Sequence, residues 1–289
     1  MTEALVGKVC LVTGGAQGIG RAIGQALAQC GAVVHVADIS RPNLAAAATH
    51  FAALPLASSV TLHHVDVTDR TAYQACIDHV RATSERLDVL VNNAAFARWC
   101  DVGEMTVEEA ELSMRTGYDA MVYGVKAVLS SMTAAGGGHI VNMGSAAGVV
   151  HVKGPSAAYA AAKAAIGAYT RMLHVELADS PVHAMLVRPA TVGGTDFFGT
   201  HVPSGRMPRL ADFLPVSAPE DVAEAVLRGI VRRRAIVDVP RCLPLMYRAF
   251  ELAPGLMRSL AARGGSARRD FGASPSRRRS LRKGGNRGS

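Results

Sequence analysis

Residues 8–20 read KVCLVTGGAQGIG, and this stretch decides the fold. Its first six residues are mostly apolar and β-branched, which is typical of a strand buried on both faces of a parallel sheet. Four of the next seven residues are glycines. Helical periodicity begins near residue 19 and continues to Gly31, a residue type that commonly ends helices. A strand, a glycine-rich turn and a helix in this order predict a phosphate-binding turn that opens an α/β domain.

Glycines in such a turn let the backbone bend sharply, approach a pyrophosphate closely and pack the helix against the strand. The free N–H groups at the helix N-terminus would then bind the phosphates. A glycine-rich loop without a ligand is the alternative. The strand before the motif, the helix after it and an acid downstream favour a dinucleotide. The predicted contacts in the turn are Gly14, Gln17, Gly18, Ile19 and Gly20.

The downstream acid is Asp38, which ends the second predicted strand 18 residues after Gly20. A carboxylate there accepts hydrogen bonds from the ribose hydroxyls of adenosine and repels a 2′-phosphate. Arg41 is close enough in sequence to weaken that repulsion, but Asp38 comes first. We therefore expect NAD as the cofactor rather than NADP. The alternative role for Asp38 is that of a helix cap or turn residue.

Strands and helices alternate as far as residue 239. The predicted strands are residues 8–13, 32–37, 60–65, 87–91, 139–143, 183–187 and 235–239. The predicted helices are residues 19–30, an Ala-rich stretch after Pro42, and residues 70–84, 107–132, 156–178 and 220–232. This alternation predicts an α/β fold with a doubly wound parallel seven-stranded sheet and helices on both faces. No linker interrupts residues 1–240, so we expect one domain there.

The charge of the chain is concentrated at one end. The chain has 289 residues and a net charge of +8, and residues 263–289 contain nine basic side chains and one acid. The tail therefore carries the whole excess, and the remaining residues balance. We expect no specific nucleic-acid binding, because contact through the tail alone would be weak and without sequence preference. The Arg-, Gly- and Ser-rich composition predicts a disordered tail.

The sequence contains no sign of secretion or of a membrane span. Residues 1–10 lack the apolar core of a signal peptide, and no stretch reaches the roughly 18 apolar residues that a span needs. The five cysteines are scattered and form neither a CxxC pair nor a zinc-binding spacing. We expect a cytoplasmic protein with free thiols and no metal site.

A second group of residues suggests acid/base chemistry. Tyr159 and Lys163 are four residues apart in an Ala-rich predicted helix, so their side chains share one face. A phenol has a pKa of about 10, and a nearby ammonium favours the ionised form that an acid/base needs at neutral pH. Ser145 ends a predicted strand and is placed to hydrogen-bond the same substrate oxygen. The predicted catalytic residues are Ser145, Tyr159 and Lys163.

Taken together, these motifs resemble the short-chain dehydrogenase/reductase family over about residues 5–240. The matching pieces are TGGAQGIG at 13–20, Asp38, Asp66 with Val67, NNAA at 92–95, Ser145, Tyr159 with Lys163, and Arg188 with Pro189. The resemblance implies the strand order 3-2-1-4-5-6-7. It also implies hydride transfer between a nicotinamide cofactor and a carbinol or carbonyl carbon.

The resemblance assigns roles to single residues. Tyr159 would be the general acid/base, Lys163 would lower the pKa of Tyr159 and hold the nicotinamide ribose, and Ser145 would polarise the substrate oxygen. Asn92 would sit by the adenosine ribose and stabilise the sheet, and Asp66 would contact adenine. The cofactor contacts that the resemblance adds are Asp66, Val67, Asn92, Ala94, Tyr159, Lys163, Pro189 and Val192.

Several positions depart from the family pattern, among them Ala95, Gly144 and Ala190. The family usually has an Asn in the helix before the fifth strand, where it holds a water in a proton relay to the lysine. Counting along the chain places Gly117 there, or Met121 under a shifted alignment, and neither side chain can hydrogen-bond. Two hypotheses therefore stand. The first is an NAD(H)-dependent oxidoreductase of a secondary alcohol or ketone. The second is an NAD(H)-binding regulatory or scaffold protein with weak or lost turnover.

Residues 190–219 form a long connection that we expect to act as a lid over the substrate. With two aromatic residues after the fourth strand, its side chains could wall an apolar pocket, which favours an apolar alcohol or ketone as substrate. The alternative is that half of these residues are ordinary packing. The predicted wall residues are Phe96, Trp99, Phe197, Phe198, Met207, Leu210, Phe213 and Leu214.

Two further parts of the sequence predict contacts outside the cofactor and catalytic motifs. The helices predicted at 107–132 and 156–178 are rather apolar all round, and by the family resemblance a second copy would cover them in a homodimer or homotetramer. Residues 241–262 are an apolar extension with interspersed Arg, predicted to form one or two short helices that cover the substrate site. The alternative is that this extension and the basic tail make weak contact with an anionic membrane surface.

Overall fold

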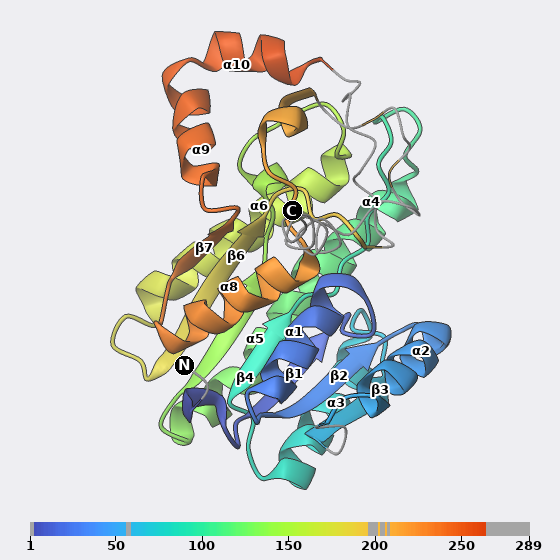
Figure 1. The fold of residues 1–289 in the computed structure, drawn as a ribbon, viewed down its shortest axis with the longest axis vertical. Helices are drawn as coiled ribbons and strands as arrows, with labels where there is room; N and C mark the ends of the chain where they lie inside the picture. The colour runs from blue at the N-terminus through green and yellow to red at the C-terminus, as the bar shows by residue number, and fades with distance from the viewer. Residues whose placement is uncertain (1–2, 56–58, 196–201, 203–205, 207–208, 264–289) are drawn as a thin grey trace, which may run out of the picture.

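The computed structural model describes residues 3–263 except 56–58, 196–201, 203–205 and 207–208. Its seven strands are all parallel and form one sheet in the order β3-β2-β1-β4-β5-β6-β7 (Figure 1), which confirms the predicted fold class and strand order. The strands are β1 (Val9–Thr13), β2 (Val33–Asp38), β3 (Val60–His64), β4 (Val89–Asn92), β5 (Gly138–Met143), β6 (Val182–Pro189) and β7 (Ile236–Val239). The strand order reverses between β1 and β4, where doubly wound sheets leave a crevice for ligands.

Helices cover both faces of this sheet (Figure 1). One face is covered by α1 (Gly18–Gln29), α2 (Arg41–Ala52) and α8 (Pro219–Val231). The other is covered by α3 (Arg70–Ser84), α5 (Ala120–Ala134) and α6 (Ala157–Glu176). Short 3-10 helices are η1 (Glu3–Leu5), η4 (Ala146–Gly148) and η5 (Arg209–Phe213), and the C-terminal helices are α9 (Leu243–Leu252) and α10 (Pro254–Ala261).

The helix predicted over residues 107–132 is divided in the structure. Its first part, α4 (Val107–Met114), begins with a capping box between Thr106 and Glu109. A π-helical turn, Arg115–Asp119, then joins α4 to α5. Such turns are rare in proteins as a whole, but those that occur are often found at functional sites. Helical periodicity in the sequence does not reveal them.

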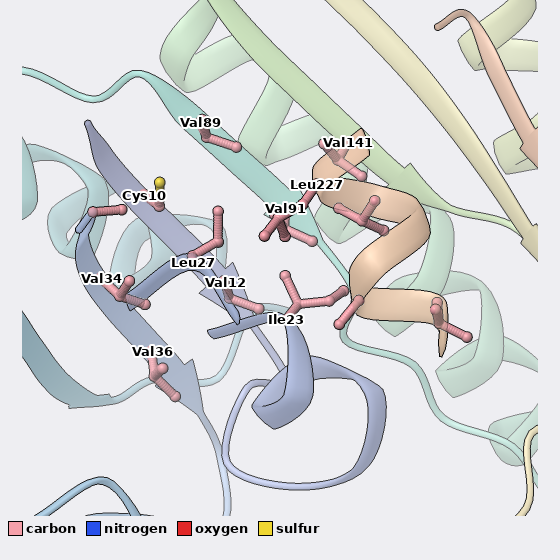
Figure 2. Packing of buried hydrophobic residues seen from close by; sticks show 14 of the residues in the cluster. Cys10, Val12, Ile23, Leu27, Val34, Val36, Val89, Val91, Val141 and Leu227 are labelled. Atoms are coloured by element: carbon pink, nitrogen blue, oxygen red, sulfur yellow. The ribbon is translucent and has the colours of Figure 1, made fainter. Parts of the chain in front are cut away.

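The strands of the sheet centre are buried on both faces, as the run at residues 8–13 predicted. All five residues of β1 are buried. Alternate side chains of β1 point to opposite faces, so Val12 packs under α1 and α8 while Leu11 packs under the helices of the other face. Figure 2 shows Ile23 of α1 and Leu227 of α8 meeting over Val12 and Val91. The core therefore holds the carboxyl ends of β1 and β4 in fixed positions.

A chain of buried hydrogen bonds crosses the second face of the sheet. The Tyr73 hydroxyl donates to Asn92 Oδ1 at 3.1 Å, and Asn92 Nδ2 donates to Asn142 Oδ1 at 2.8 Å. Asn142 Nδ2 donates to Thr170 Oγ1 at 3.0 Å. The chain links α3, β4, β5 and α6 and satisfies polar groups that would otherwise be costly to bury. It also sets the position of α6 relative to β5.

The C-terminal tail predicted to be disordered lies, from residue 264 onward, outside the described residues. Within the part of the chain that is described, no helix combines the length and the apolar character that crossing a bilayer requires.

Gly124 on α5 tests this buried network. A Cβ at Gly124 would lie 2.7 Å from both Asn92 Oδ1 and the Tyr73 hydroxyl. We predict that Gly124→Ala lowers the free energy of unfolding by about 2 kcal/mol, because the crowding displaces a buried hydrogen-bonded pair. Urea denaturation measures the change. The matched control is Gly167→Ala on α6, where the nearest atom is 3.8 Å away. Equal stability of the two variants would contradict the prediction.

Candidate active site

A cavity of about 750 Å³ opens at the carboxyl ends of the strands, where the strand order reverses. It contains the three predicted catalytic residues and every predicted cofactor contact except Asn92. The predicted residues that line it are Gly14, Gln17, Gly18, Ile19, Gly20, Asp38, Asp66, Val67, Ala94, Ser145, Tyr159, Lys163, Pro189 and Val192. Residues from seven separate parts of the sequence therefore meet in one cavity, as the predicted arrangement of strands requires.

The glycine turn has the close contacts that its sequence indicates. Gly14 has φ +59°, and a Cβ there would lie 2.9 Å from the Ala94 Cα. A Cβ on Gly20 would lie 2.2 Å from the Gly14 carbonyl oxygen. Gly18 has φ +53° and opens α1 with nothing closer than 3.6 Å to a Cβ position. The turn thus leaves the N-terminus of α1 facing the cavity, with room for an anion.

Asp38 is held by the backbone on two sides. Its Oδ2 accepts a hydrogen bond from the Ala16 N–H at 3.1 Å, and its Oδ1 accepts one from the Ser40 N–H at 3.0 Å. The cap of α2 is Ser40, whose hydroxyl accepts from the Asn43 N–H. Asp38 is buried, and its carboxylate lines the cavity. The two backbone hydrogen bonds therefore hold the Asp38 side chain at the cavity wall.

Asn92 points into the core, and its neighbour Asn93 lines the cavity instead. The Asn93 side chain donates to the carbonyls of Thr13 and Gly14, both at 3.0 Å. The Thr13 hydroxyl accepts from the Asn93 and Ala94 N–H groups. Sequence reasoning missed Asn93. The available signal was the alternation of side chains along a strand, which sends two successive asparagines to opposite sides.

Ser145 lies between the other two catalytic candidates and β6. Its hydroxyl accepts from the Ala147 N–H at 3.1 Å and donates to the Pro189 carbonyl at 3.5 Å. Burial raises the pKa of the partly buried Tyr159, and a hydrogen bond with Ser145 opposes that rise. Ser145 and Tyr159 therefore face one point in the cavity, where a substrate oxygen would bind both.

Lys163 is buried one turn after Tyr159. Its Nζ donates to the Met143 carbonyl at 2.7 Å and lies 5.7 Å from the centre of the Tyr159 ring. Only 6% of Lys163 is exposed, and burial lowers its pKa to about 8. The β5 backbone therefore fixes the ammonium beside the phenol.

Gly117 lies in the π-helical turn and packs against α6 next to Lys163. A Cβ at Gly117 would meet the Ala162 Cβ at 3.6 Å and Ile166 at 3.8 Å, which are ordinary contacts. Packing therefore does not require a glycine there. Met121, the other candidate, is fully buried in the core beneath α5. Thr116, in the same turn, lines the cavity and was not predicted.

Apolar side chains wall one end of the cavity. Phe96 and Trp99 line it as predicted, and Leu214 of the predicted lid lines it as well. Phe213 does not, because 84% of it is exposed, so the prediction for this residue was wrong. The side chains of Phe197, Phe198, Met207 and Leu210 lie outside the described part. Wall residues that were not predicted are Leu112, Val150, Val152, Pro155, Ala211 and Met246.

The C-terminal extension is attached beside the catalytic candidates. The Arg188 guanidinium forms two hydrogen bonds with Asp238, at 2.8 and 2.7 Å, and lies 4.7 Å from the centre of the Tyr247 ring. The Tyr247 hydroxyl donates to Asp238 at 3.3 Å. Both members of the ion pair are nearly buried. This cluster attaches α9 to the ends of β6 and β7, so that Met246 faces the cavity.

The comparisons with known proteins agree with this geometry. The profile of the family described as short chain dehydrogenase matches residues 8–203. The chain belongs to the short-chain dehydrogenase/reductase family. It is therefore an NAD(P)-dependent oxidoreductase of the kind that acts on CH–OH or C=O groups.

Relatives within the family carry several activities. SadH of Mycobacterium tuberculosis, described as an oxidoreductase, is 32% identical over 81% of this chain and 86% of its own. The sorbitol dehydrogenase of Cereibacter sphaeroides is 34% identical over 68% of this chain and 74% of its own. The cyclopentanol dehydrogenase of Comamonas testosteroni is 32% identical over 64% of this chain and 73% of its own.

A solved structure supports the fold. A short-chain dehydrogenase/reductase from Burkholderia phymatum in complex with NAD superimposes with a TM-score of 0.76 at 23% identity. The match covers 88% of this chain and 96% of that one. The match to the family profile confirms the family resemblance that was inferred from the motifs.

The buried ammonium of Lys163 makes stability depend on pH. Folding lowers its pKa from 10.5 to about 8, so below pH 8 folding carries the full cost of burying the charge. That cost is on the order of 3 kcal/mol, and it declines as pH rises from 8 to 10.5. We predict that Lys163→Met raises the free energy of unfolding at pH 7 by about 2 kcal/mol relative to the wild type. This gain in stability should shrink towards pH 10.

Chemical denaturation at several pH values provides the measurement for Lys163→Met. The exposed Lys126→Met serves as the control and should show no such pH dependence. A Lys163→Met protein that is less stable than the wild type at pH 7 would show that the ammonium is not buried at a cost.

Proposed function

We propose that the protein is an NAD(H)-dependent oxidoreductase that transfers a hydride between nicotinamide and an apolar secondary alcohol or ketone. The observation that carries this proposal is the meeting of Ser145, Tyr159 and Lys163 at one end of a cavity, beside an apolar wall. The other end of the same cavity contains the glycine turn and Asp38. A dinucleotide spanning the two ends would bring its nicotinamide to the catalytic side chains.

The residues present fit a dinucleotide. Positions 14 and 20 are too crowded for a side chain, yet the N-terminus of α1 faces open cavity, which suits a pyrophosphate. Asp38, fixed by two backbone N–H groups, supports ribose recognition and exclusion of a 2′-phosphate. Asp66 and Val67 lie on the cavity wall beside it and would border the adenine. We infer a preference for NAD over NADP.

When bound, the nicotinamide supplies the hydride acceptor or donor, and the protein supplies placement and proton transfer. Tyr159 would remove the hydroxyl proton of an alcohol during oxidation and return it to the oxygen during reduction. Ser145 would hydrogen-bond that oxygen and align it with the phenol. Lys163 places a positive charge near the phenol ring, which favours the phenolate over the neutral form.

The lining of the catalytic end favours an apolar substrate. Beyond Ser145 the wall is formed by Phe96, Trp99, Leu214 and Met246. Such a surface binds hydrocarbon by removing it from water and offers few partners to additional hydroxyls. One relative is named for cyclopentanol, a cyclic secondary alcohol, and another for sorbitol. The apolar wall makes the first kind of substrate the better fit.

We also propose that the protein is a homodimer or homotetramer. The outward side of α6 exposes Met172 and Val175, at 56% and 69% of their surface. A shallow depression lies between α4 and α6, lined by Met114 and Ala161 and by the charged residues Glu111, Arg115 and Asp119. A second copy of the chain would cover this side of the helices.

Tyr159→Phe tests the mechanism. The variant keeps the ring and loses the proton-transfer group, so we predict a fall in kcat of about 10³-fold or more, with a far smaller change in NAD affinity. Turnover is measured by NADH absorbance with a panel of apolar secondary alcohols, and affinity is measured by calorimetry. The control is Tyr169→Phe on the same helix, which should keep full activity.

The same panel separates the two functional hypotheses. NAD binding without turnover of any alcohol or ketone would favour the regulatory or scaffold protein. Full activity of Tyr159→Phe would refute the proton-transfer role of Tyr159 while leaving the oxidoreductase in place.

Asp38→Asn tests cofactor choice. The amide keeps the hydrogen bond to a ribose hydroxyl but removes the charge that repels a 2′-phosphate. We predict that the wild type prefers NAD over NADP in kcat/KM, and that the variant reduces this preference by about tenfold or more. Steady-state kinetics with both cofactors gives the ratio, with the exposed Asp78→Asn as control. A wild type that prefers NADP would refute the proposed role of Asp38.

A further inference from the structure

Helix α9 is apolar on two sides, and the described residues cover only one of them. On the inner side, Leu243 and Tyr247 are buried against Ala146 and Val150. On the outer side, Leu245 is 69% exposed and Leu252 is 86% exposed. Burying one apolar face is enough to attach a helix to a domain, so a second exposed face indicates another contact.

Large apolar side chains are also exposed in the neighbouring segments. Leu256 of α10 is 63% exposed. Phe213, in the η5 helix that packs against α10, is 84% exposed. Leu252 and Phe213 are the two most exposed large apolar side chains in the described part of the chain. Figure 1 shows α9 and α10 standing out from the domain at the end of the sheet where the strands terminate.

The charges among these leucines are almost all positive. Arg241, Arg248, Arg258 and Arg263 are exposed, and Glu251 is the one exposed acid between residues 241 and 263. Leu245, Arg248 and Leu252 follow the spacing i, i+3, i+7, which places leucines and arginine on one stripe of α9. Residues 264–289, which follow α10 directly, add eight basic side chains and one acid.

We propose that this leucine–arginine face, defined by Arg241, Leu245, Arg248, Leu252, Leu256 and Arg258, docks the enzyme on the surface of an anionic lipid bilayer. Exposed leucines enter the boundary between headgroups and acyl chains, and the arginines pair with anionic headgroups. Leucine side chains add nothing to the binding of nucleic-acid phosphates. A second copy of the same face would place its arginines against one another. An anionic lipid surface satisfies both the leucines and the arginines.

The extension is attached firmly enough to transmit such docking to the whole domain. The cluster of Arg188, Asp238 and Tyr247 fixes α9 at its start. At the far end of the extension, the Lys153 N–H donates to the Ala261 carbonyl at 2.9 Å. The extension is thus bound at both ends to segments that border the cavity. Docking of its outer face would orient the catalytic domain relative to the bilayer.

A further consequence concerns the substrate, and it rests on the proposed function. Met246 lines the cavity while the adjacent Leu245 faces outward, so the same turn of α9 would touch substrate and membrane. The enzyme would then act on alcohols or ketones that partition into the bilayer. The docking itself does not depend on this consequence.

Co-sedimentation of the full-length protein with vesicles tests the docking without any substrate. The vesicles are phosphatidylcholine alone or phosphatidylcholine mixed with phosphatidylglycerol. We expect binding to the mixed vesicles that weakens as salt is added. A variant with Leu245→Ser, Leu252→Ser and Leu256→Ser should bind about tenfold more weakly or worse. The matched control carries Val6→Ser and Val102→Ser, at similarly exposed positions away from the proposed oligomer surface, and should bind like the wild type.

Other outcomes would overturn the proposal. One is a wild type that does not sediment with the anionic vesicles at low salt. Another is a serine variant that binds like the wild type while removal of residues 264–289 abolishes binding, which would assign the contact to the tail alone. A third is a serine variant that keeps vesicle binding but dissociates an oligomer in size-exclusion chromatography, which would make the face a contact between copies. Loss of turnover in the alcohol panel with intact docking would refute only the proposed function.

Discussion

The hydrogen bonds between the ends of β1 and β4 determine where the rest of the site can lie. The Asn93 side chain binds the carbonyls of Thr13 and Gly14, and the Thr13 hydroxyl accepts from the backbone after β4. These bonds bring the two loops so close that position 14 admits no side chain. The gap between the loops becomes one end of the cavity. The glycine at position 14 is therefore required by this approach, apart from any part it plays in the proposed binding of a dinucleotide.

Helix α6, which carries the proposed catalytic residues Tyr159 and Lys163, depends on a second set of buried bonds. Asn142 and Met143, successive residues of β5, bind Thr170 and Lys163 of α6. Two contacts seven residues apart leave α6 little freedom to slide or rotate against the strand. The same arrangement buries an ammonium, which reduces stability at neutral pH. The protein thus gives up stability to keep a positive charge beside Tyr159, a common exchange at active sites.

Much of the fold and of the candidate site could be predicted from the sequence, because local patterns determine both. The period of apolar residues distinguished strands from helices, and the strand-turn-helix order located the cavity. Asn92 shows a limit. A motif identifies neighbouring residues, but it does not say in which direction each side chain points. In the structure the Asn92 side chain points into the core, whereas Asn93 lines the cavity. The π-helical turn at Arg115–Asp119 and the exposure of Phe213 depend on tertiary packing, which periodicity does not contain.

Because α9 is attached separately, the positions of the proposed reacting groups and part of the cavity lining come from different segments of the chain. The sheet and α6 position the reacting groups, whereas Met246 comes from a segment beyond β7 that the family profile, ending at residue 203, does not include. That segment is joined to the sheet through a small polar cluster and a few apolar contacts. It has the character of an exchangeable module. Grafting a different C-terminal segment onto Asp238 and Arg188 is a route to new substrate ranges that leaves the catalytic machinery untouched.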